Sequence, residues 1–168
     1  MNKRYSGYII GGLLILLGIW VVIAYNSFVG KEEKVKLQWA EVQNAYQRRL
    51  NLVPNLVNVV KGGASFEQTT LQKIAEARAK ATNITVSGDV TAQQFNAQSA
   101  AQDELAAAAN RLLIVVEKYP DLKGARAFSD LQAQLEGTER RIKFARKDFN
   151  ESIAAYNSSV RKIGRAHV

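Results

Sequence analysis

The chain has 168 residues, which suits one domain of ordinary size, and 47% of them are hydrophobic, so a wholly disordered chain is not expected. There is no cysteine, and the single histidine, His167, stands next to the last residue. These counts exclude disulfides and thiolate chemistry, nearly exclude histidine-based metal or general-base chemistry, and suggest no cofactor. The net charge of +8 is spread along the chain, so we interpret it as promoting solubility rather than binding.

The first predicted element is a membrane span over Tyr8–Tyr25, after a short N-terminal tail (residues 1–7). The span carries no charge, and about 20 helical residues cross a bilayer core of about 30 Å. Aromatic rings stand toward its ends at Tyr8, Trp20 and Tyr25, where amphipathic rings favour the headgroup boundary. We therefore expect the lipid bilayer as a partner of Tyr8–Tyr25.

Two alternatives for this segment fit less well. A buried core helix of a soluble protein would turn a polar stripe toward water, and this run has none. A cleaved signal peptide would end in a small-x-small pattern, which the exit Ala24–Phe28 lacks. We favour an uncleaved single-pass anchor. Basic residues flank it on both sides, so the side that carries the rest of the chain stays open.

Four amphipathic helices are predicted beyond Gly30, because apolar residues recur at gaps of three and four. The first ends at Gly62-Gly63, where glycine supplies the left-handed conformation that closes many helices. Its apolar face comprises Val35, Trp39, Val42, Tyr46, Leu50, Val53, Val57 and Val60. Pro54 lies inside it and predicts either a kink or the start of a new helix, with Asn55 placed to satisfy freed backbone groups. We favour a structural kink over a hinge that moves on binding.

A capping-box pattern at Ser65–Gln68 opens the second helix, and another at Thr91–Gln94 opens the third. A loop over Thr82–Val90 separates the two helices. Pro120 is expected to end the third helix. The fourth carries Phe128, Leu131, Leu135, Ile142, Ala145, Phe149, Ile153, Tyr156 and Val160. Short connections favour an all-α fold in which an antiparallel four-helix bundle (residues 26–162), with a long helical hairpin, follows the transmembrane helix. A continuous coiled coil is the alternative.

The densest basic run is Arg140–Lys147. We interpret it as a solvated helix face, with a patch for anionic lipid or nucleic acid as the alternative. Arg146 could pair with a carboxylate of a neighbouring helix, for example Glu76. Phe144 is expected in the core or a groove, so base-stacking aromatics are not interleaved and nucleic acid is not expected as a partner.

Motifs in order along the chain resemble the LemA family of bacterial membrane-anchored proteins. They include Arg49–Val57, Glu76–Arg78, Tyr119–Lys123, Thr138-Glu139, Ala145-Arg146, Phe149-Asn150 and Tyr156-Asn157. The resemblance implies an all-α bundle, no established enzymatic activity and a bacterial plasma (inner) membrane location. The family usually has aspartate where this chain has Asn51, which makes an essential ion pair between that site and Arg49 doubtful. Candidate structural or interaction residues within these motifs are Arg49, Pro54, Asn55, Tyr119, Pro120, Glu139, Arg146 and Asn150.

The last six residues, Ile163–Val168, match one reading frame of a common sequencing-library adapter, so we expect a truncated reading frame there. For function, we expect a non-catalytic, membrane-tethered scaffold with protein partners of unknown identity or further copies of itself. The alternative is a signalling or sensory module in which the bundle transmits ligand or partner binding.

Overall fold

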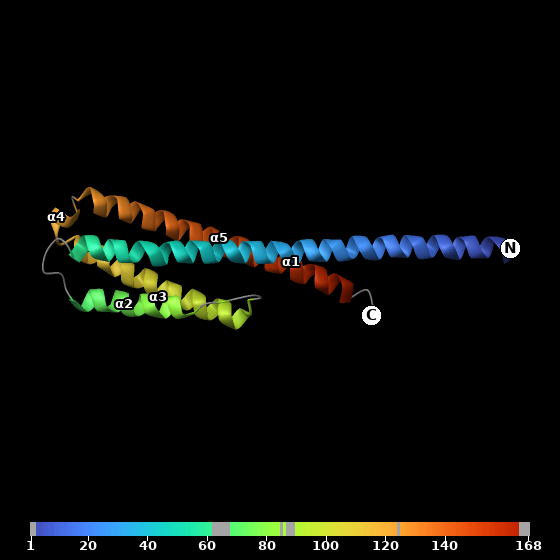
Figure 1. Cartoon of the computed structure of the whole chain (residues 1–168), viewed down its shortest axis with the longest axis horizontal. Helices are drawn as coiled ribbons and strands as arrows, with labels where there is room; N and C mark the ends of the chain where they lie inside the picture. Colours follow the sequence, from blue (N-terminus) through green and yellow to red (C-terminus); the bar gives the residue numbers. More distant parts are fainter. Residues whose placement is uncertain (1–2, 62–67, 85, 87–89, 124, 165–168) are drawn as a thin grey trace. The chain divides into compact units, whose positions relative to one another are not determined.

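The computed structural model describes residues 3–61, 68–84, 86, 90–123 and 125–164 (Figure 1). Over these residues it contains five helices and no strand, which confirms the all-α fold. The helices are α1 (Lys3–Lys61), α2 (Gln68–Asn83), α3 (Ala92–Val116), α4 (Pro120–Lys123) and α5 (Arg126–Gly164). The expected membrane span and the first bundle helix are therefore parts of one helix, α1.

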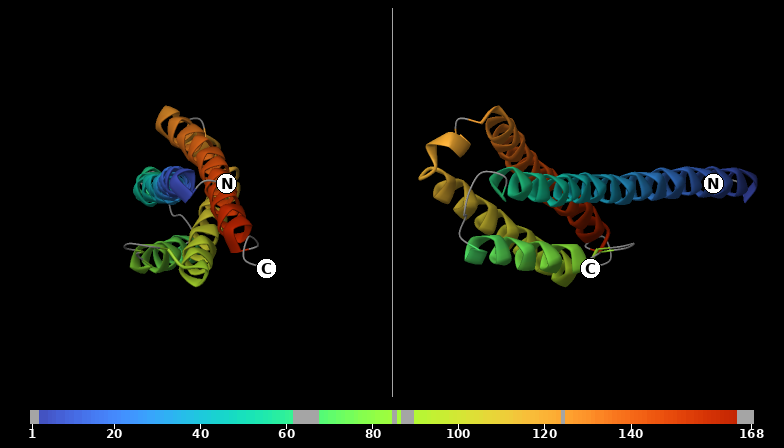
Figure 2. Two further views of the ribbon diagram at one scale, coloured as in Figure 1. Left: turned by 90° about the vertical axis from the view of Figure 1, so that its right-hand side faces the viewer. Right: turned by 60° about the vertical axis from the view of Figure 1, so that its left-hand side comes forward.

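The chain divides into two compact units, and α1 and α5 each contribute to both. Unit 1 comprises Met1–Gln38 and Asp148–Val168, and unit 2 comprises Trp39–Lys147. In unit 2 the segments of α1, α2, α3 and α5 follow one another in alternating directions, as the two views of Figure 2 also show. This unit is the antiparallel bundle that the helical periodicity predicts.

Unit 2 has one apolar core, which the predicted helix faces build. Every helix of the bundle turns its residues at spacing three and four inward, and burial of that stripe stabilises a helix far more than its intrinsic propensity does. Its buried members are Leu50, Val53, Leu56, Val60, Ile74, Ala77, Ala81, Ala101, Leu105, Ala109, Leu112, Val116, Phe128 and Leu135. Helix α2 lies beside α3 in this core (Figure 1).

The helix ends follow local sequence signals where they are described. The Thr91 side chain accepts a hydrogen bond from the Gln94 backbone N–H, and the Gln94 side chain accepts one from the Thr91 backbone, so the predicted capping box at α3 is present. At the other capping box, Ser65–Glu67 lie outside the described residues, as do Gly62-Gly63, and α2 begins at Gln68. Of the suspect tail, residues 165–168 also lie outside them.

The two prolines act differently from one another. Pro54 lies inside α1, which continues through it as a single helix, so of the two alternatives considered for Pro54 the start of a new helix does not hold. Helix α3 ends at Val116, before the expected stop at Pro120, because Lys118 and Tyr119 donate to carbonyls three residues back and tighten the chain into a turn. Pro120 then opens the short helix α4, where its missing N–H costs nothing.

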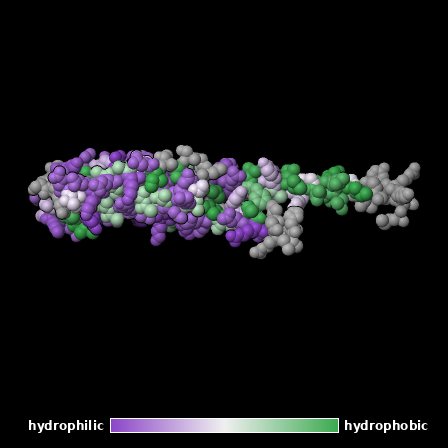
Figure 3. Space-filling view, turned by 90° about the horizontal axis from the view of Figure 1, so that it is seen from below, coloured by the Kyte–Doolittle hydropathy of each residue, from purple (hydrophilic) through white to green (hydrophobic). Residues whose placement is uncertain are grey.

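The first part of α1, in unit 1, presents apolar side chains to the outside. Ile10, Leu13–Leu17, Ile19–Ile23 and Tyr25 are all exposed, and Figure 3 shows the hydrophobic surface of this segment in green. Its most apolar window has a mean hydropathy of 2.1 and is 0% buried, and α1 is long and apolar enough to cross a membrane. A core helix of a soluble protein with this composition would be mostly buried.

Candidate functional site

The most distinctive group of unit 2 is a charged arginine in its interior. Arg49 stands one turn after Tyr46 on the inward face of α1, and its side chain is 1% exposed. Its Nε donates to Oε1 of Glu139 on α5 at 2.7 Å, and its Nη2 donates to Oε2 of the same carboxylate. Its Nη1 donates to the backbone carbonyl of Gln102 on α3 at 2.8 Å and to the Gln102 side-chain Oε1 at 3.2 Å. One guanidinium thus connects three helices.

This arrangement meets the conditions under which a buried charge is tolerated. Removing an ion from water costs several kcal/mol, which only a close counter-charge and further hydrogen bonds offset. The planar guanidinium meets the carboxylate in a two-bond fork, the strongest geometry for such a pair. The Glu139 side chain is 35% exposed, so water reaches the carboxylate end of the pair while the Arg49 end is dry.

A second arginine, Arg146 of α5, lies at the edge of the same interior. Its Nε donates to the Tyr46 hydroxyl at 2.6 Å, and its Nη2 donates to Asp103 Oδ1 at 2.9 Å and to the Ser99 carbonyl at 3.3 Å. The carbon centre of its guanidinium lies 5.2 Å from the Tyr46 ring centroid, within reach of a cation–π contact. Arg146 therefore pairs with a carboxylate of a neighbouring helix, as the sequence suggested, but that carboxylate is Asp103 on α3 and not the example Glu76.

The surroundings of Arg146 act on its charge in opposite directions. Burial disfavours the charged form, but hydrogen bonds and charge interactions with Asp103 and Tyr46 outweigh it, so the pKa of Arg146 is raised above its ordinary value. The guanidinium therefore stays charged throughout the physiological range. It acts as a fixed donor and cannot serve as a proton carrier.

The two arginines belong to one layer of polar groups that crosses α1, α3 and α5 inside unit 2. We call it the polar layer, and its members are Tyr46, Arg49, Ser99, Gln102, Asp103, Glu139 and Arg146. Tyr46 and Ser99 close the layer through their hydroxyls, which lie 3.1 Å apart. Within the described ranges no group of three or more histidine, aspartate or glutamate side chains comes together as a metal-ligand set.

A cavity of about 140 Å³ adjoins the polar layer within unit 2, between α1, α2 and α3. Two buried amide atoms beside it have no hydrogen-bond partner, namely Gln98 Oε1 and Gln102 Nε2. Leaving such a group unpaired in the interior costs about 1–3 kcal/mol. Both atoms are buried, so neither lies on the accessible wall of the pocket.

Comparison with known proteins bears on this site. The LemA family description matches residues 38–168, which include all of unit 2 and every member of the polar layer. The chain belongs to the LemA family. Its relatives include magnetosome protein MamQ of Magnetospirillum gryphiswaldense, which is 25% identical over 160 residues, covering 84% of this chain and 59% of the relative. Magnetosome protein MamQ 1 of Paramagnetospirillum magneticum is 24% identical over 160 residues, with the same coverage.

A third relative carries the family's own name. Protein LemA of Metamycoplasma hominis is 27% identical over 146 residues, covering 82% of this chain and 63% of the relative. The chain therefore spans about three fifths of the length of the curated relatives that it matches. Family membership and the exposed apolar part of α1 together fit a membrane-anchored helical protein.

The structure brings three of the eight candidate residues of this LemA-family chain into the polar layer: Arg49, Glu139 and Arg146. The other candidates lie elsewhere. Pro54 is partly exposed inside α1, and Asn55 lies at an open surface pocket with Asn51. Tyr119 packs against the apolar core, and Pro120 is exposed at the start of α4.

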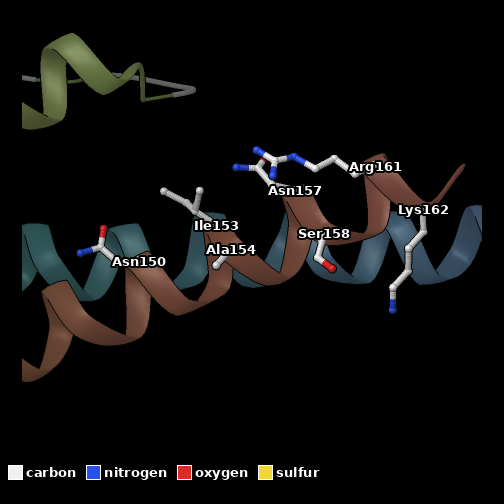
Figure 4. A pocket seen from close by; sticks show the side chains of 7 residues that line it. All are labelled: Asn150, Ile153, Ala154, Asn157, Ser158, Arg161 and Lys162. Carbon is white, nitrogen blue, oxygen red and sulfur yellow. The ribbon is translucent and has the colours of Figure 1, made fainter. Parts of the chain in front are cut away.

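Asn150 belongs to unit 1 and has its own surroundings. It lines a surface hollow of about 530 Å³, and Figure 4 shows that all the labelled side chains around it come from α5, with Asn157 and Arg161 close to one another. Lys31 of α1 donates to the Ser159 hydroxyl in the same unit.

Phe144, which was expected in the core or a groove, is 61% exposed, so that prediction was wrong. Its position on α5 falls between the buried stripe residues Ile142 and Ala145.

Sequence reasoning missed four members of the polar layer: Tyr46 as a hydrogen-bonding residue, Ser99, Gln102 and Asp103. A signal for one of them was present. Gln98 and Gln102 precede Leu105, Ala109 and Leu112 at the same spacing of three and four on α3. A glutamine in phase with an apolar stripe indicates a buried polar group, which needs partners from other helices.

Proposed function

We propose that this chain is a single-pass protein of the bacterial plasma membrane, in which Tyr8–Tyr25 spans the bilayer and unit 2 serves as a non-catalytic scaffold. The observation that carries the proposal is the exposure of the apolar part of α1: Leu16, for example, is 69% exposed. Burying one leucine or isoleucine side chain away from water gains about 1.5–3 kcal/mol, so a whole run of them requires an apolar solvent.

The interior of unit 2 supports a structural role. The side chains that could do acid–base work in the polar layer, Glu139 and Asp103, are each held by an arginine. Arg49 and Arg146 in turn use their donors on protein groups from other helices. A layer built in this way fixes the packing of three helices, which suits a rigid platform for protein partners or further copies of the chain.

The anchor is tested by placing arginines in the apolar part of α1. Leu16→Arg together with Ile19→Arg should remove the chain from carbonate-washed membranes, because each arginine near the bilayer centre costs about 2.5–3.5 kcal/mol of insertion. Leu37→Arg is the matched control, since Leu37 is exposed on the same helix outside the span and its variant should stay in the membrane. Mass spectrometry of the membrane-bound chain should find it intact from its first residue.

Two results would contradict the anchor: wild-type chain in the soluble fraction with its N-terminus intact, or membrane fractions that hold only chain cleaved after the apolar run. The scaffold role is tested by crosslinking and mass spectrometry in native membranes, where one recurring protein partner is expected. Turnover of any substrate by the purified chain would rule out a purely non-catalytic role.

A further inference from the structure

The exposed face of α5 around Phe144 has the features of a protein interface. Phe144 is 61% exposed and lies out of phase with the buried stripe of its helix. Arg140 stands four residues before it and Arg141 three residues before it, so both are its neighbours on the helix surface. We call Arg140, Arg141, Lys143 and Phe144 the basic face, and all four residues are exposed and belong to unit 2.

Two cations of the basic face lack the counter-charges that helical spacing would give them. The carboxylate four residues before Arg140 is that of Glu136, which accepts a hydrogen bond from a glutamine of its own helix. The carboxylate four residues before Lys143 is that of Glu139, which Arg49 holds in the polar layer. Within the described part of the chain neither cation forms an ion pair. Their charges are therefore open to another molecule.

A second helix adds to this charge through a surface hollow of about 420 Å³ between the unit 2 segments of α1 and α5. Arg48 of α1 and Arg141 of α5 both line it, and both are exposed. Its described lining holds one carboxylate, that of Glu41, which forms no described ion pair with either arginine. Each guanidinium can therefore meet a carboxylate of another molecule in a two-bond fork.

The composition of this surface favours a protein partner. Arginine and aromatic side chains are enriched in protein interfaces, where lysine is depleted, and three of the four cations here are arginines. Single-stranded nucleic acid stacks its bases on several aromatic rings, whereas Phe144 is the one ring of the basic face. Anionic lipid headgroups bind basic clusters that directly adjoin a membrane span, and the basic face is far from Tyr8–Tyr25 along the chain.

We propose that the basic face, together with Arg48, docks an acidic segment of a protein partner, whose carboxylates pair with the arginines and whose apolar side chain covers Phe144. The proposal rests on the scaffold role and deepens it by naming the chemistry of the partner. Arg140 and Lys143 stand three residues apart and repel one another, and carboxylates of the partner remove this repulsion. Burial of the Phe144 ring supplies the apolar contribution that exposed charge pairs lack.

The test measures peptide binding to the full chain in phosphatidylcholine nanodiscs by isothermal titration calorimetry. The probe is a synthetic helical peptide with glutamates on both sides of a central leucine, and its control peptide has glutamine in place of every glutamate. The acidic peptide should bind at least about tenfold more tightly than its control. Its affinity should fall as salt is added, because the ion pairs are exposed.

Charge-reversed variants separate the basic face from the net charge of the chain. Arg140→Glu together with Arg141→Glu should weaken binding of the acidic peptide at least about tenfold, because two attractive contacts become repulsive. Arg111→Glu together with Lys118→Glu changes the net charge equally at two exposed positions in and just after α3. This control should bind within about twofold of the wild-type chain.

The apolar contact has its own variant. Phe144→Ser should weaken binding of the acidic peptide about tenfold, as expected for an aromatic anchor at the centre of an interface. Ile114→Ser is the matched control, since Ile114 is a 64% exposed apolar residue of α3, and its variant should bind like the wild-type chain.

Three results overturn the proposal: equal binding of the two peptides, equal losses in the two charge-reversed variants, or binding by the basic face of phosphatidylglycerol vesicles but not of the acidic peptide. A photocrosslinker in place of Phe144 then distinguishes this surface from the scaffold role, and in native membranes it should capture an acidic segment. A partner captured only through other positions of unit 2 would overturn the basic face and leave the scaffold. Absence of any partner, with peptide binding intact, would contradict the scaffold alone.

Discussion

The apolar part of α1 in unit 1 and the interior of unit 2 reverse the usual arrangement of a soluble protein. In the first, leucines and isoleucines face outward along the helix, and Leu16 is 69% exposed. In the second, the centre contains a charged arginine that is 1% exposed. The comparison teaches that exposure alone does not decide which residue a position accepts. The apolar segment suits a lipid solvent, whereas the interior accepts Arg49 because its partners are supplied by other helices.

The largest expected loss of stability in unit 2 comes from removing the counter-charge of Arg49. Glu139→Ala should lower the free energy of unfolding of unit 2 by about 3–5 kcal/mol, because it leaves a dry guanidinium without its carboxylate. Arg49→Met should cost less, since the remaining Glu139 carboxylate is 35% exposed and can be hydrated. Urea unfolding of the full chain in detergent micelles, followed by circular dichroism, measures both changes.

Glu136→Ala provides the matched control on α5, because Glu136 is exposed and its described contact is with its neighbour Gln132. Its effect should stay within about 0.5 kcal/mol. A larger loss for Arg49→Met than for Glu139→Ala would contradict the account of a dry arginine and a wet carboxylate.

The same leucine-to-alanine change sharpens the contrast between the regions. Leu105 is fully buried in the core of unit 2, so Leu105→Ala should cost about 2–5 kcal/mol of unfolding free energy through lost burial and a residual cavity. Leu16→Ala should change that quantity by less than about 0.5 kcal/mol, because the side chain leaves no protein cavity. The urea unfolding measurement described above tests both variants. Equal losses of unfolding free energy at the two positions would mean that Leu16 packs against protein.

A smaller effect is expected from the edge of the polar layer. Tyr46→Phe removes the hydroxyl that accepts from Arg146 at 2.6 Å and lies 3.1 Å from Ser99 Oγ, and should cost about 1.5 kcal/mol. The ring stays in place, so the core packing is kept. Tyr156→Phe, in unit 1, is the control. A neutral result for Tyr46→Phe would show that water replaces the hydroxyl at no cost.

The smallest effect should come from the exposed carboxylate of the layer. Asp103→Asn should cost about 0.2–1 kcal/mol, because the Asp103 side chain is 61% exposed and water screens its pair with Arg146. The loss should shrink with added salt. Because the pKa of Arg146 is raised on folding, its contribution to stability is fully present below the unfolded pKa and is lost only as pH rises through the higher folded pKa. Titration of Arg146 should therefore not change the free energy of unfolding between about pH 6 and pH 9. A salt-independent loss would contradict this assignment.

The sequence predicted those features of the fold that residues close together in the chain determine. The capping box at Thr91 and the buried stripe from Trp39 to Val60 follow from spacing within a few turns. The exposure of Phe144 could also have been predicted, because Phe144 is out of phase with the buried residues Ile142 and Ala145. The prediction of a core or groove position followed the apolar character of the side chain instead of this phase.

The polar layer depends on information that the local sequence does not contain. Arg49 was a candidate, yet its partner Glu139 is 90 residues away, and no spacing rule pairs them. The choice between Glu76 and Asp103 for Arg146 depends on which helix faces α5, since both carboxylates are exposed. The cavity likewise exists only once α1, α2 and α3 are assembled.

The distance along the chain between Arg49 and Glu139 has a consequence for synthesis. The arginine leaves the ribosome 90 residues before its carboxylate, which at about 5–20 residues per second means a delay of roughly 5–20 s. During that interval α1 can be helical but cannot bury its guanidinium, so the nascent hairpin stays hydrated and open to chaperones. A truncated chain that lacks Glu139 would keep an unpaired Arg49 guanidinium permanently. This unpaired charge would mark the truncated chain for proteolysis, whereas full-length copies, in which the ion pair forms, would not be degraded.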